Sequence, residues 1–191
     1  MKIFEVNADL DKYDACVANY KKMQLCGKLK TGEQALDFDG TSRINGWWPR
    51  EMKRFNERPL GDYISNLIRG VIIMEKGAID KLSTVMENVE ILPLKCKFGD
   101  YWAVNILTVL DCLDYEKCDG IKIPRESLGN ELGIIYFTKY CFIPDRVKDK
   151  ILFKILGHEK SGIYANESFV KEVELHGITG FKFEQIWEST R

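Results

Sequence analysis

The sequence predicts an α+β fold in which a mostly antiparallel, mixed sheet packs with a few helices. Two observations support this prediction. Segments with strand-like alternation outnumber segments with helical spacing, and the strand-like segments arrive in clusters along the chain. Such clusters favour antiparallel pairing over the regular strand–helix alternation of a parallel sheet.

The chain begins with a predicted strand over residues 1–7, MKIFEVN. Asp9 can cap a following helix, whose apolar positions recur at steps of three and four: Leu10, Tyr13, Val17 and Tyr20. Gly27 is expected to end this helix. From about residue 28 to 69 glycine and proline interrupt every pattern, and so long an irregular segment is usually functional or packed as an extended wrap.

The middle of the chain has the clearest pattern. VIIM, residues 71–74, predicts a short strand, and a helix over about 76–87 follows with one apolar face: Ile79, Leu82, Val85 and Met86. Two strands around the Gly99-Asp100 turn are predicted to form a hairpin. Pro93 shifts the alternation, so these side chains should share one side: Leu92, Leu94, Cys96 and Phe98. The second hairpin strand is apolar on both faces, which fits a central strand covered twice.

The C-terminal part is predicted to contain a long strand over 133–143 and short strands at ILFKI and GIYA. Asn166 can cap a helix that turns Phe169, Val170 and Val173 towards the core, and Gly177 suits its left-handed end. A half-exposed strand, TGFKFEQIW, closes the chain. We expect a single domain over 1–191, in which residues 1–36 could form a strand–helix annex to the region 37–191.

Composition excludes several classes of function. Twenty-eight basic and twenty-nine acidic residues leave a net charge of −1, so no overall field favours nucleic acid or an anionic membrane. No apolar run approaches the ~20 residues of a spanning helix. Polar residues interrupt the N-terminal segment before a signal peptide could form, and we therefore expect a cytoplasmic protein.

Cysteines and histidines predict no metal site and no cofactor. The six cysteines include no C-x-x-C pair, and we expect free thiols, several of them buried in strands. His176 suits the last turn of its helix, and His158 is expected to be a solvated turn residue. Neither a phosphate-binding glycine loop nor a serine nucleophile elbow occurs, so we expect no catalytic residue.

One acidic cluster follows a predicted strand, in TVLDCLDYEKCD. Asp111 and Asp114 could hold a cation or share acid and base duties, as in a small hydrolase or a nucleotide-acting enzyme. The simpler interpretation is that both side chains end the strand and face water beside Glu116 and Asp119.

The stretch RINGWWPREMKRFNERPLGDY, residues 43–63, combines aromatic and basic residues. It could stack nucleobases, form a protein-interface hot spot, or anchor a loop on its own core. We favour the anchor: at least one of Trp47 and Trp48 should pack against the domain, with Arg58 and Asp62 fixing the loop. The outward side is a candidate partner surface, and the candidate contact residues are Trp47, Trp48, Arg50, Arg54, Asp111 and Asp114.

An ordered series of motifs resembles a bacterial family. From about residue 37 to 188 the series runs W-x-P, RPLGD, the strand and helix of 71–87, ILPL, YWAVNILTVLDCLD, IIYF and HGITGFKFEQIWES. It is similar to the immunity proteins of polymorphic toxin systems numbered family eleven, formerly a domain of unknown function. The family pattern has a serine capping the helix after VIIM, and Glu75 stands in that place here.

The resemblance implies a partner and a way of working. It implies a protein that is encoded beside a secreted toxin and that binds and blocks the toxin without enzymatic activity or a cofactor. It supplies no catalytic residues to transfer. A cognate toxin is then the expected partner, and neither nucleic acid nor a membrane is. If the toxin is a nuclease, the acidic residues after position 110 could mimic phosphate groups.

Overall fold

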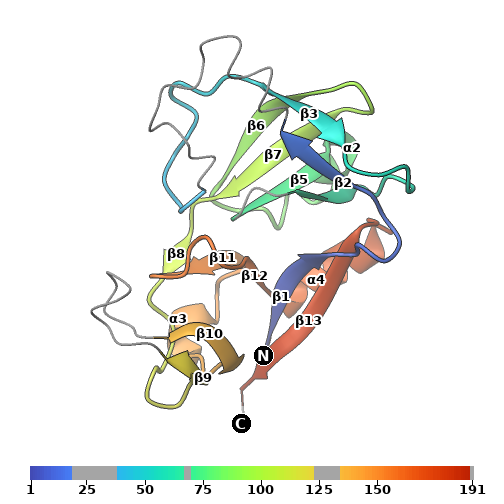
Figure 1. Cartoon of the computed structure of the whole chain (residues 1–191). Helices are drawn as coiled ribbons and strands as arrows, with labels where there is room; N and C mark the ends of the chain where they lie inside the picture. The colour runs from blue at the N-terminus through green and yellow to red at the C-terminus, as the bar shows by residue number, and fades with distance from the viewer. Residues whose placement is uncertain (19–37, 67–69, 123–133, 190–191) are drawn as a thin grey trace.

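Most of the regular structure is strand, arranged in two lobes (Figure 1). The computed structural model describes residues 1–18, 38–66, 70–122 and 134–189. In chain order the elements are β1 (Lys2–Ala8), β2 (Ala15–Ala18), β3 (Arg50–Arg54), β4 (Tyr63–Asn66), β5 (Val71–Glu75), α2 (Lys76–Lys81), β6 (Val89–Cys96), β7 (Tyr101–Ile106), β8 (Val109–Leu110), β9 (Asp119–Lys122), β10 (Ile134–Lys139), α3 (Pro144–Val147), β11 (Leu152–Ile155), β12 (Tyr164–Asn166), α4 (Glu167–Leu175) and β13 (Phe181–Glu188).

One lobe is a closed barrel of six strands in the order β2-β3-β6-β7-β5-β4. Four of its pairings are antiparallel, and two short parallel pairings, β2 with β4 and β3 with β6, complete the ring. Closure leaves the barrel without a free edge. Apolar side chains fill the interior, among them Cys16, Met52, Ile64, Ile73, Leu92 and Ala103.

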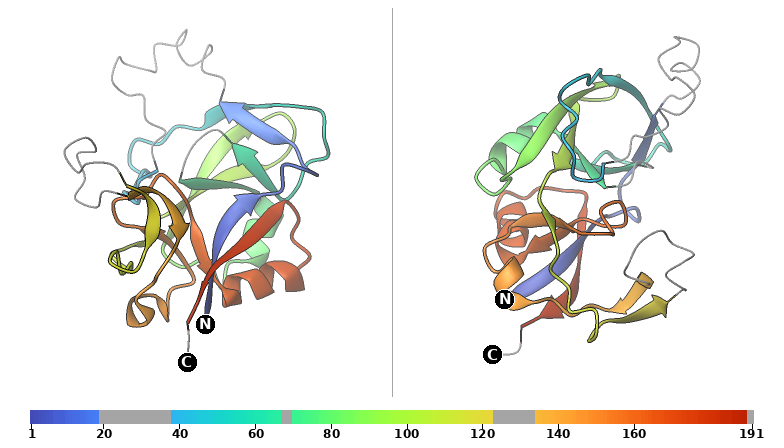
Figure 2. Two further views of the ribbon diagram at one scale, coloured as in Figure 1. Left: turned by 60° about the horizontal axis from the view of Figure 1, so that its bottom comes forward. Right: turned by 90° about the vertical axis from the view of Figure 1, so that its left-hand side faces the viewer.

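The other lobe is a five-stranded sheet in the order β13-β1-β12-β11-β8, of which only β11–β8 is parallel. The β9–β10 ribbon and α3 pack on one face of this sheet, and α4 packs on the other. Two further views show the barrel above and the sheet below, with both chain ends at the sheet (Figure 2). The predicted α+β class is thus right in outline. In place of the single mixed sheet that we predicted, however, the structure has a closed barrel, a separate five-stranded sheet and the β9–β10 ribbon.

Strands β5 and β7 separate two apolar cores, because both strands are buried on both faces. Val71, Ile73 and Ala103 face the barrel interior. Their neighbours Ile72 and Met74, with others on β7, face a second core that α2, α4 and β1 share. The predicted hairpin of β6 and β7 and its twice-covered second strand are confirmed. The prediction that Leu92, Leu94, Cys96 and Phe98 share one side is also confirmed. Leu92 is buried in the barrel core, and the other three side chains pack against it.

Glu75, which stands in the place of the family's capping serine, caps helix α2. The carboxylate of Glu75 accepts hydrogen bonds from the backbone N–H groups of Gly77 and Ala78. Glutamate is therefore the N-cap residue here, in place of a serine. Helix α2 is shorter than the predicted 76–87 and ends at Lys81. Its predicted apolar face is nevertheless buried throughout, because the following turns continue over the same core.

The C-terminal prediction is largely confirmed. The side-chain oxygen of Asn166 accepts from the N–H groups of Ser168 and Phe169 at the start of α4. Gly177 follows the helix with φ 61°, a left-handed conformation that favours glycine. The predicted strand over 133–143 is shorter, however, because the chain turns after Lys139 and begins α3 at Pro144.

The helix predicted after Asp9 is wrong within the described residues. Asp9 caps only a turn. Its backbone carbonyl accepts a hydrogen bond from Tyr13 N at 3.0 Å, and its carboxylate accepts one from Lys12 N at 3.3 Å. The chain then enters β2, where Cys16 and Ala18 are buried in strand alternation. Residues 19–27 of that prediction lie outside the described part. The segment 28–69 is also less irregular than predicted, because it contributes β3 and β4 to the barrel.

Five cysteines lie in the described part, and all are free thiols, as predicted: Cys16, Cys96, Cys112, Cys118 and Cys141. Burial raises the pKa of the Cys96 thiol to about 11, which keeps it protonated and unreactive at neutral pH. The longest helix in this part of the chain is α4, of nine residues, and no helix described has the length and apolarity needed to cross a bilayer.

A buried carboxylate joins the segment before β3 to the barrel. Glu90, on β6, accepts hydrogen bonds from Ser42 Oγ, from Arg43 N at 2.7 Å and from Ile44 N at 3.4 Å. The buried amide of Asn105 donates to the same carboxylate at 3.0 Å. Burial would raise the pKa of Glu90, but these hydrogen bonds outweigh it and the pKa is lowered.

We predict that Glu90→Gln destabilises the fold by about 1–3 kcal/mol at pH 7, because an amide cannot accept all of these hydrogen bonds. The wild-type contribution is complete above the ordinary pKa of 4.5 and is lost as pH falls through the lowered folded-state pKa. Urea unfolding from pH 7 to pH 3 should therefore show a shallower loss of stability in the variant. Glu87→Gln, at an exposed position, is the control. Equal unfolding curves for wild type and Glu90→Gln would contradict this role.

Candidate functional site

The two tryptophans of the aromatic-basic segment pack on the barrel. The indole of Trp47 donates to the carbonyl of Pro93 at 2.9 Å, and its ring lies 6.0 Å from that of Phe38. Both tryptophans are half-buried beside the barrel core. The guanidinium of Arg50 lies over the Trp48 ring, 4.0 Å from its centroid. The prediction that at least one tryptophan anchors this segment is confirmed.

Arg54 forms a salt bridge with the buried carboxylate of Asp14. Its Nε donates to Asp14 Oδ2 at 2.8 Å, and the other carboxylate oxygen accepts from Ala15 N and Asn56 N. Burial would raise the pKa of Asp14, but the hydrogen bond from Arg54 and those from the backbone outweigh it and lower the pKa. Arg54 therefore links β3 to the chain before β2.

Arg58 and Asp62 fix the end of the segment, as predicted. The Arg58 guanidinium donates to the carbonyl of Leu10. The Asp62 carboxylate accepts from the backbone N–H of Thr179 at 2.7 Å and from its hydroxyl at 2.6 Å. These bonds tie the barrel to both ends of the chain.

The acidic residues after β8 have cationic partners from their own chain. Asp111 pairs with Arg146 at 2.8 Å, and Asp114 pairs with Lys117 at 2.6 Å. The hydrogen bond from Lys117 lowers the pKa of Asp114. Within the described ranges no group of three or more His, Cys, Asp or Glu side chains could hold a metal ion. The structure brings neither acid together with the tryptophan segment, which belongs to the barrel lobe.

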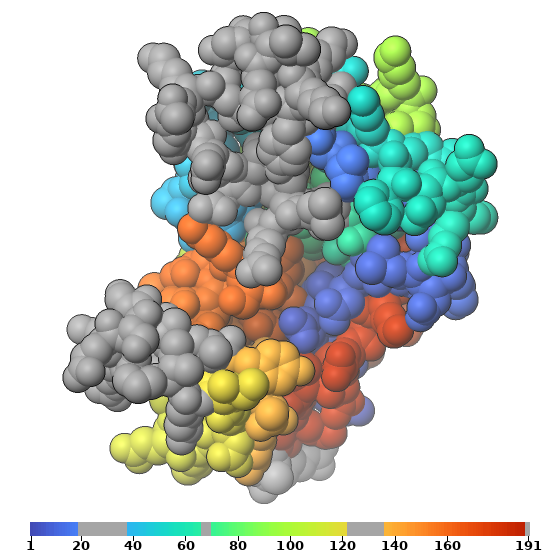
Figure 3. Space-filling model, in the orientation of Figure 1, coloured from blue at the N-terminus to red at the C-terminus, as the bar shows by residue number. Residues whose placement is uncertain are grey.

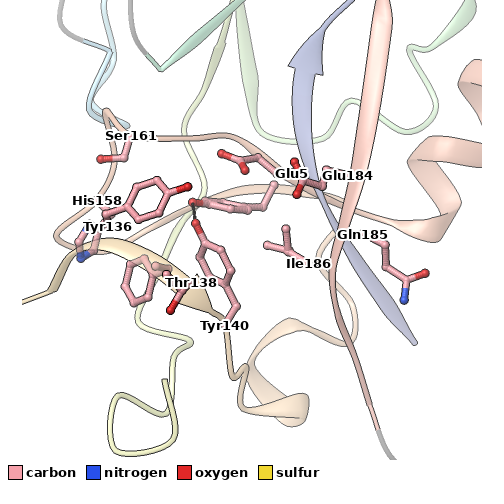
Figure 4. A pocket seen from close by; sticks show the side chains of 11 residues that line it. Glu5, Tyr136, Thr138, Tyr140, His158, Ser161, Glu184, Gln185 and Ile186 are labelled. Atoms are coloured by element: carbon pink, nitrogen blue, oxygen red, sulfur yellow. Dashed lines mark hydrogen bonds between the residues drawn. The ribbon is translucent and has the colours of Figure 1, made fainter. Parts of the chain in front are cut away.

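A separate hollow lies between β10 and the paired strands β1 and β13 (Figure 4). On the face seen in Figure 3, β10 (gold) lies beside β1 (blue) and β13 (red). We call this hollow the β10–β13 groove. Its volume is about 520 Å³, and its lining residues are Glu5, Tyr136, Phe137, Thr138, Tyr140, His158, Ser161, Tyr164, Glu184, Gln185 and Ile186. The groove therefore combines carboxylates, phenols and an imidazole on elements that the sequence places far apart.

Two glutamates lie side by side in the groove. Glu5 on β1 is directly opposite Glu184 on β13. Like charges in such a cross-strand pair destabilise a sheet. Neither carboxylate forms an ion pair within the part of the chain that the structure describes. Burial, and then the charge of Glu184, raise the pKa of Glu5.

Tyrosines form the facing wall. The hydroxyls of Tyr140 and Tyr164 lie 3.2 Å apart, and the Tyr140 ring stacks on Phe137 with centroids 4.8 Å apart. Tyr136, on the same strand as Phe137, is 61 % exposed. Burial raises the pKa of Tyr140, so this phenol carries no negative charge at neutral pH.

His158 is not the solvated turn residue that the sequence predicts. Its side chain is only 6 % exposed, and its ring meets the edge of Phe137 with centroids 4.9 Å apart. The polar neighbours of His158 in LGHEKSG suggest exposure, but the turn folds over the β10 strand. Burial lowers the pKa of His158, so the imidazole is neutral at pH 7. His176, by contrast, is in the last turn of α4 as predicted, with Nε2 3.5 Å from Glu172.

Sequence reasoning missed the groove because strand pairing creates it. Glu5 and Glu184 come from opposite ends of the chain, and each looks like an ordinary polar position of a half-exposed strand. The available signal was the alternation of both strands, which places polar side chains on one face. That signal does not reveal which strands are neighbours.

A protein-family model matches part of the chain. The family model described as "Immunity protein family (Imm11)" matches residues 93–188, half of the chain. The matched range runs from within β6 to the end of β13, so it contains most of the β10–β13 groove but neither Glu5 nor the tryptophan segment. The range is shorter than the 37–188 over which the motif series resembles the family. No curated protein matches the chain.

We predict that Glu5→Gln stabilises the fold at pH 7 by about 0.2–1 kcal/mol, because it removes a like-charge cross-strand pair. The pKa of Glu5 is raised in the folded state, so its ionisation opposes folding, and wild type recovers stability as pH falls through that pKa. The advantage of the variant should therefore shrink between pH 7 and pH 4 in thermal unfolding.

The matched control for this prediction is Glu188→Gln on the same strand. Glu188 lies opposite Lys2, so its neutralisation removes an attraction and should not stabilise. Equal effects of the two substitutions, or a less stable Glu5→Gln protein, would contradict the strain that we assign to the Glu5–Glu184 pair.

Proposed function

Because this chain belongs to the Imm11 immunity protein family, we propose that it neutralises a cognate bacterial toxin by binding the toxin protein directly. The family match over residues 93–188 carries the proposal. The chain would act stoichiometrically, by covering a surface that the toxin needs. A specific interface of this kind buries on the order of 1,600 Å² and depends on a few aromatic or arginine anchors.

The described surface offers suitable anchors. Ile121 and Tyr136 are cross-strand partners on the β9–β10 ribbon, and both side chains are more than half exposed. Leu10 and Phe55 line a smaller hollow of about 230 Å³ together with Arg58. Exposed aromatic and arginine side chains beside a hollow are typical of binding hot spots. These features support a binding role.

The residues that the sequence predicts as partner contacts divide into two groups. Trp48 and Arg50 present a stacked aromatic–guanidinium pair on the barrel, and we propose this pair as one contact point. Trp47 and Arg54 support it through their bonds to Pro93 and Asp14. The second group is Asp111 and Asp114, and we propose that these acids contact basic groups of the toxin.

Co-expression with the toxin encoded beside this chain tests the proposal. The wild-type chain should restore growth and co-purify with the toxin in a one-to-one ratio. The double substitution Trp48→Ala, Arg50→Ala should weaken the affinity measured by calorimetry by at least about tenfold, which is the effect of removing a hot-spot residue.

Leu175→Ala is the control for this experiment, because Leu175 is 75 % exposed on α4, outside the proposed contacts. It should bind as wild type does. The proposal fails if the wild-type chain neither restores growth nor co-purifies. If the double variant binds like wild type, the tryptophan segment is not part of the interface.

A further inference from the structure

We propose that the β10–β13 groove binds an arginine side chain of the partner toxin. This inference rests on the proposed function for the identity of the partner, and on the groove itself for the chemistry. It follows from three features of the groove: a pair of negative charges, an aromatic wall, and a buried polar group without a hydrogen-bond partner in the part of the chain that the structure describes.

The negative charge comes from Glu5 and Glu184. Both side chains extend from their strands towards the tyrosine wall, whereas Gln185 points away from it (Figure 4). Because the two carboxylates are cross-strand neighbours without an ion pair in the described ranges, they repel each other in the unbound protein. A cation between them would replace this repulsion with two attractions and favour ionisation of Glu5.

The aromatic wall selects among cations. A guanidinium is planar, has five N–H donors and can bond two carboxylates while it stacks on a phenol ring. Tyr136, in the wall opposite the glutamates, offers such a ring, because its side chain is 61 % exposed. A lysine ammonium is a compact, strongly hydrated point charge and gains less from a stacked aromatic face. The groove therefore fits arginine better than lysine.

His158 supplies an independent sign of a binding site. Its side chain is more than nine-tenths buried against the groove, and its buried Nε2 has no hydrogen-bond partner among the described residues. A buried polar atom left unpaired costs free energy, as the glutamate pair does. The glutamate pair and the unpaired Nε2 both lower the stability of the fold, and both lie in one groove. Such a combination is typical of a functional site, where residues needed for binding are kept although they destabilise the fold. The neutral imidazole also leaves the net negative charge of the groove intact.

The size of the groove fits an arginine together with the chain that bears it. A volume of about 520 Å³ is within the range of sites for small ligands. The exposed Ile121 and Tyr136 on the adjacent ribbon would contact residues on either side of that arginine. We therefore place the groove within the toxin interface, with the ribbon at its rim.

The first arm of the test uses a small probe. N-acetyl-L-arginine methylamide is titrated into the full chain and followed by two-dimensional NMR, with the lysine and norleucine analogues in parallel. The expected result is binding of the arginine probe, with shifts in β10 and β13, at least tenfold tighter than that of either analogue. Substitution of both glutamates, Glu5→Gln with Glu184→Gln, should weaken arginine binding at least tenfold.

Glu174→Gln is the control, because it removes a carboxylate at an exposed position of α4, outside the groove. It should bind the probe as wild type does. Equal binding of the arginine and lysine probes would overturn the proposal, as would arginine binding that the double substitution leaves unchanged. The substituted protein is expected to fold at least as stably as wild type, so unfolding does not confuse the result.

The second arm measures toxin affinity for the same variants. The double substitution should weaken toxin binding at least tenfold, and Glu174→Gln should not. If the toxin binds wild type and the double variant equally, the groove proposal is overturned while the proposed function stands. If the toxin does not bind wild type, the proposed function fails, and the arginine probe alone decides whether the groove recognises a guanidinium.

Discussion

Burial of β5 and β7 on both faces is the constraint on which the rest of the structure depends. Alternate side chains of these strands belong to different cores, so Ile73 packs inside the barrel while its neighbour Ile72 packs against the other lobe. Each large apolar side chain buried in this way contributes about 1.5–3 kcal/mol. The two lobes are thus joined by a shared wall, and β1, α4 and β13 are held in place against it. The groove follows from this arrangement, because β1 and β13 form one of its sides.

The sequence predicts best where neighbouring residues decide the structure. The β6–β7 hairpin, the Asn166 cap and the left-handed Gly177 all depend on interactions within a few residues. The segment after Asp9 shows the limit. Its apolar spacing suits a helix, but pairing with β3 and β4 makes residues 15–18 a strand. Tertiary pairing outweighs local preference there, and the parallel pairings of β2 with β4 and of β3 with β6 close a barrel that alternation alone could not predict.

The candidate sites show the same division. The anchoring of Trp47 and the fixing of the segment by Asp62 could be predicted, because a tryptophan in an irregular segment usually needs a surface to pack on. The ion-pair partners of Asp111 and Asp114 could not be predicted. The structure pairs Asp111 with Arg146 and Asp114 with Lys117. The groove was beyond prediction, since it needs Glu5 and Glu184 to be neighbours. A like-charge pair is unfavourable in a sheet. It indicates a binding site here only because the aromatic wall and the buried His158 line the same groove.

Amide hydrogen exchange of the chain, alone and bound to its cognate toxin, tests the central claim most directly. That claim is that the toxin binds across the groove while the β5–β7 wall stays unchanged. We expect slower exchange in residues 134–140 and 181–188 on binding, and equally slow exchange in β5 and β7 in both states. Unchanged exchange in β10 and β13 in a saturated complex would contradict the account.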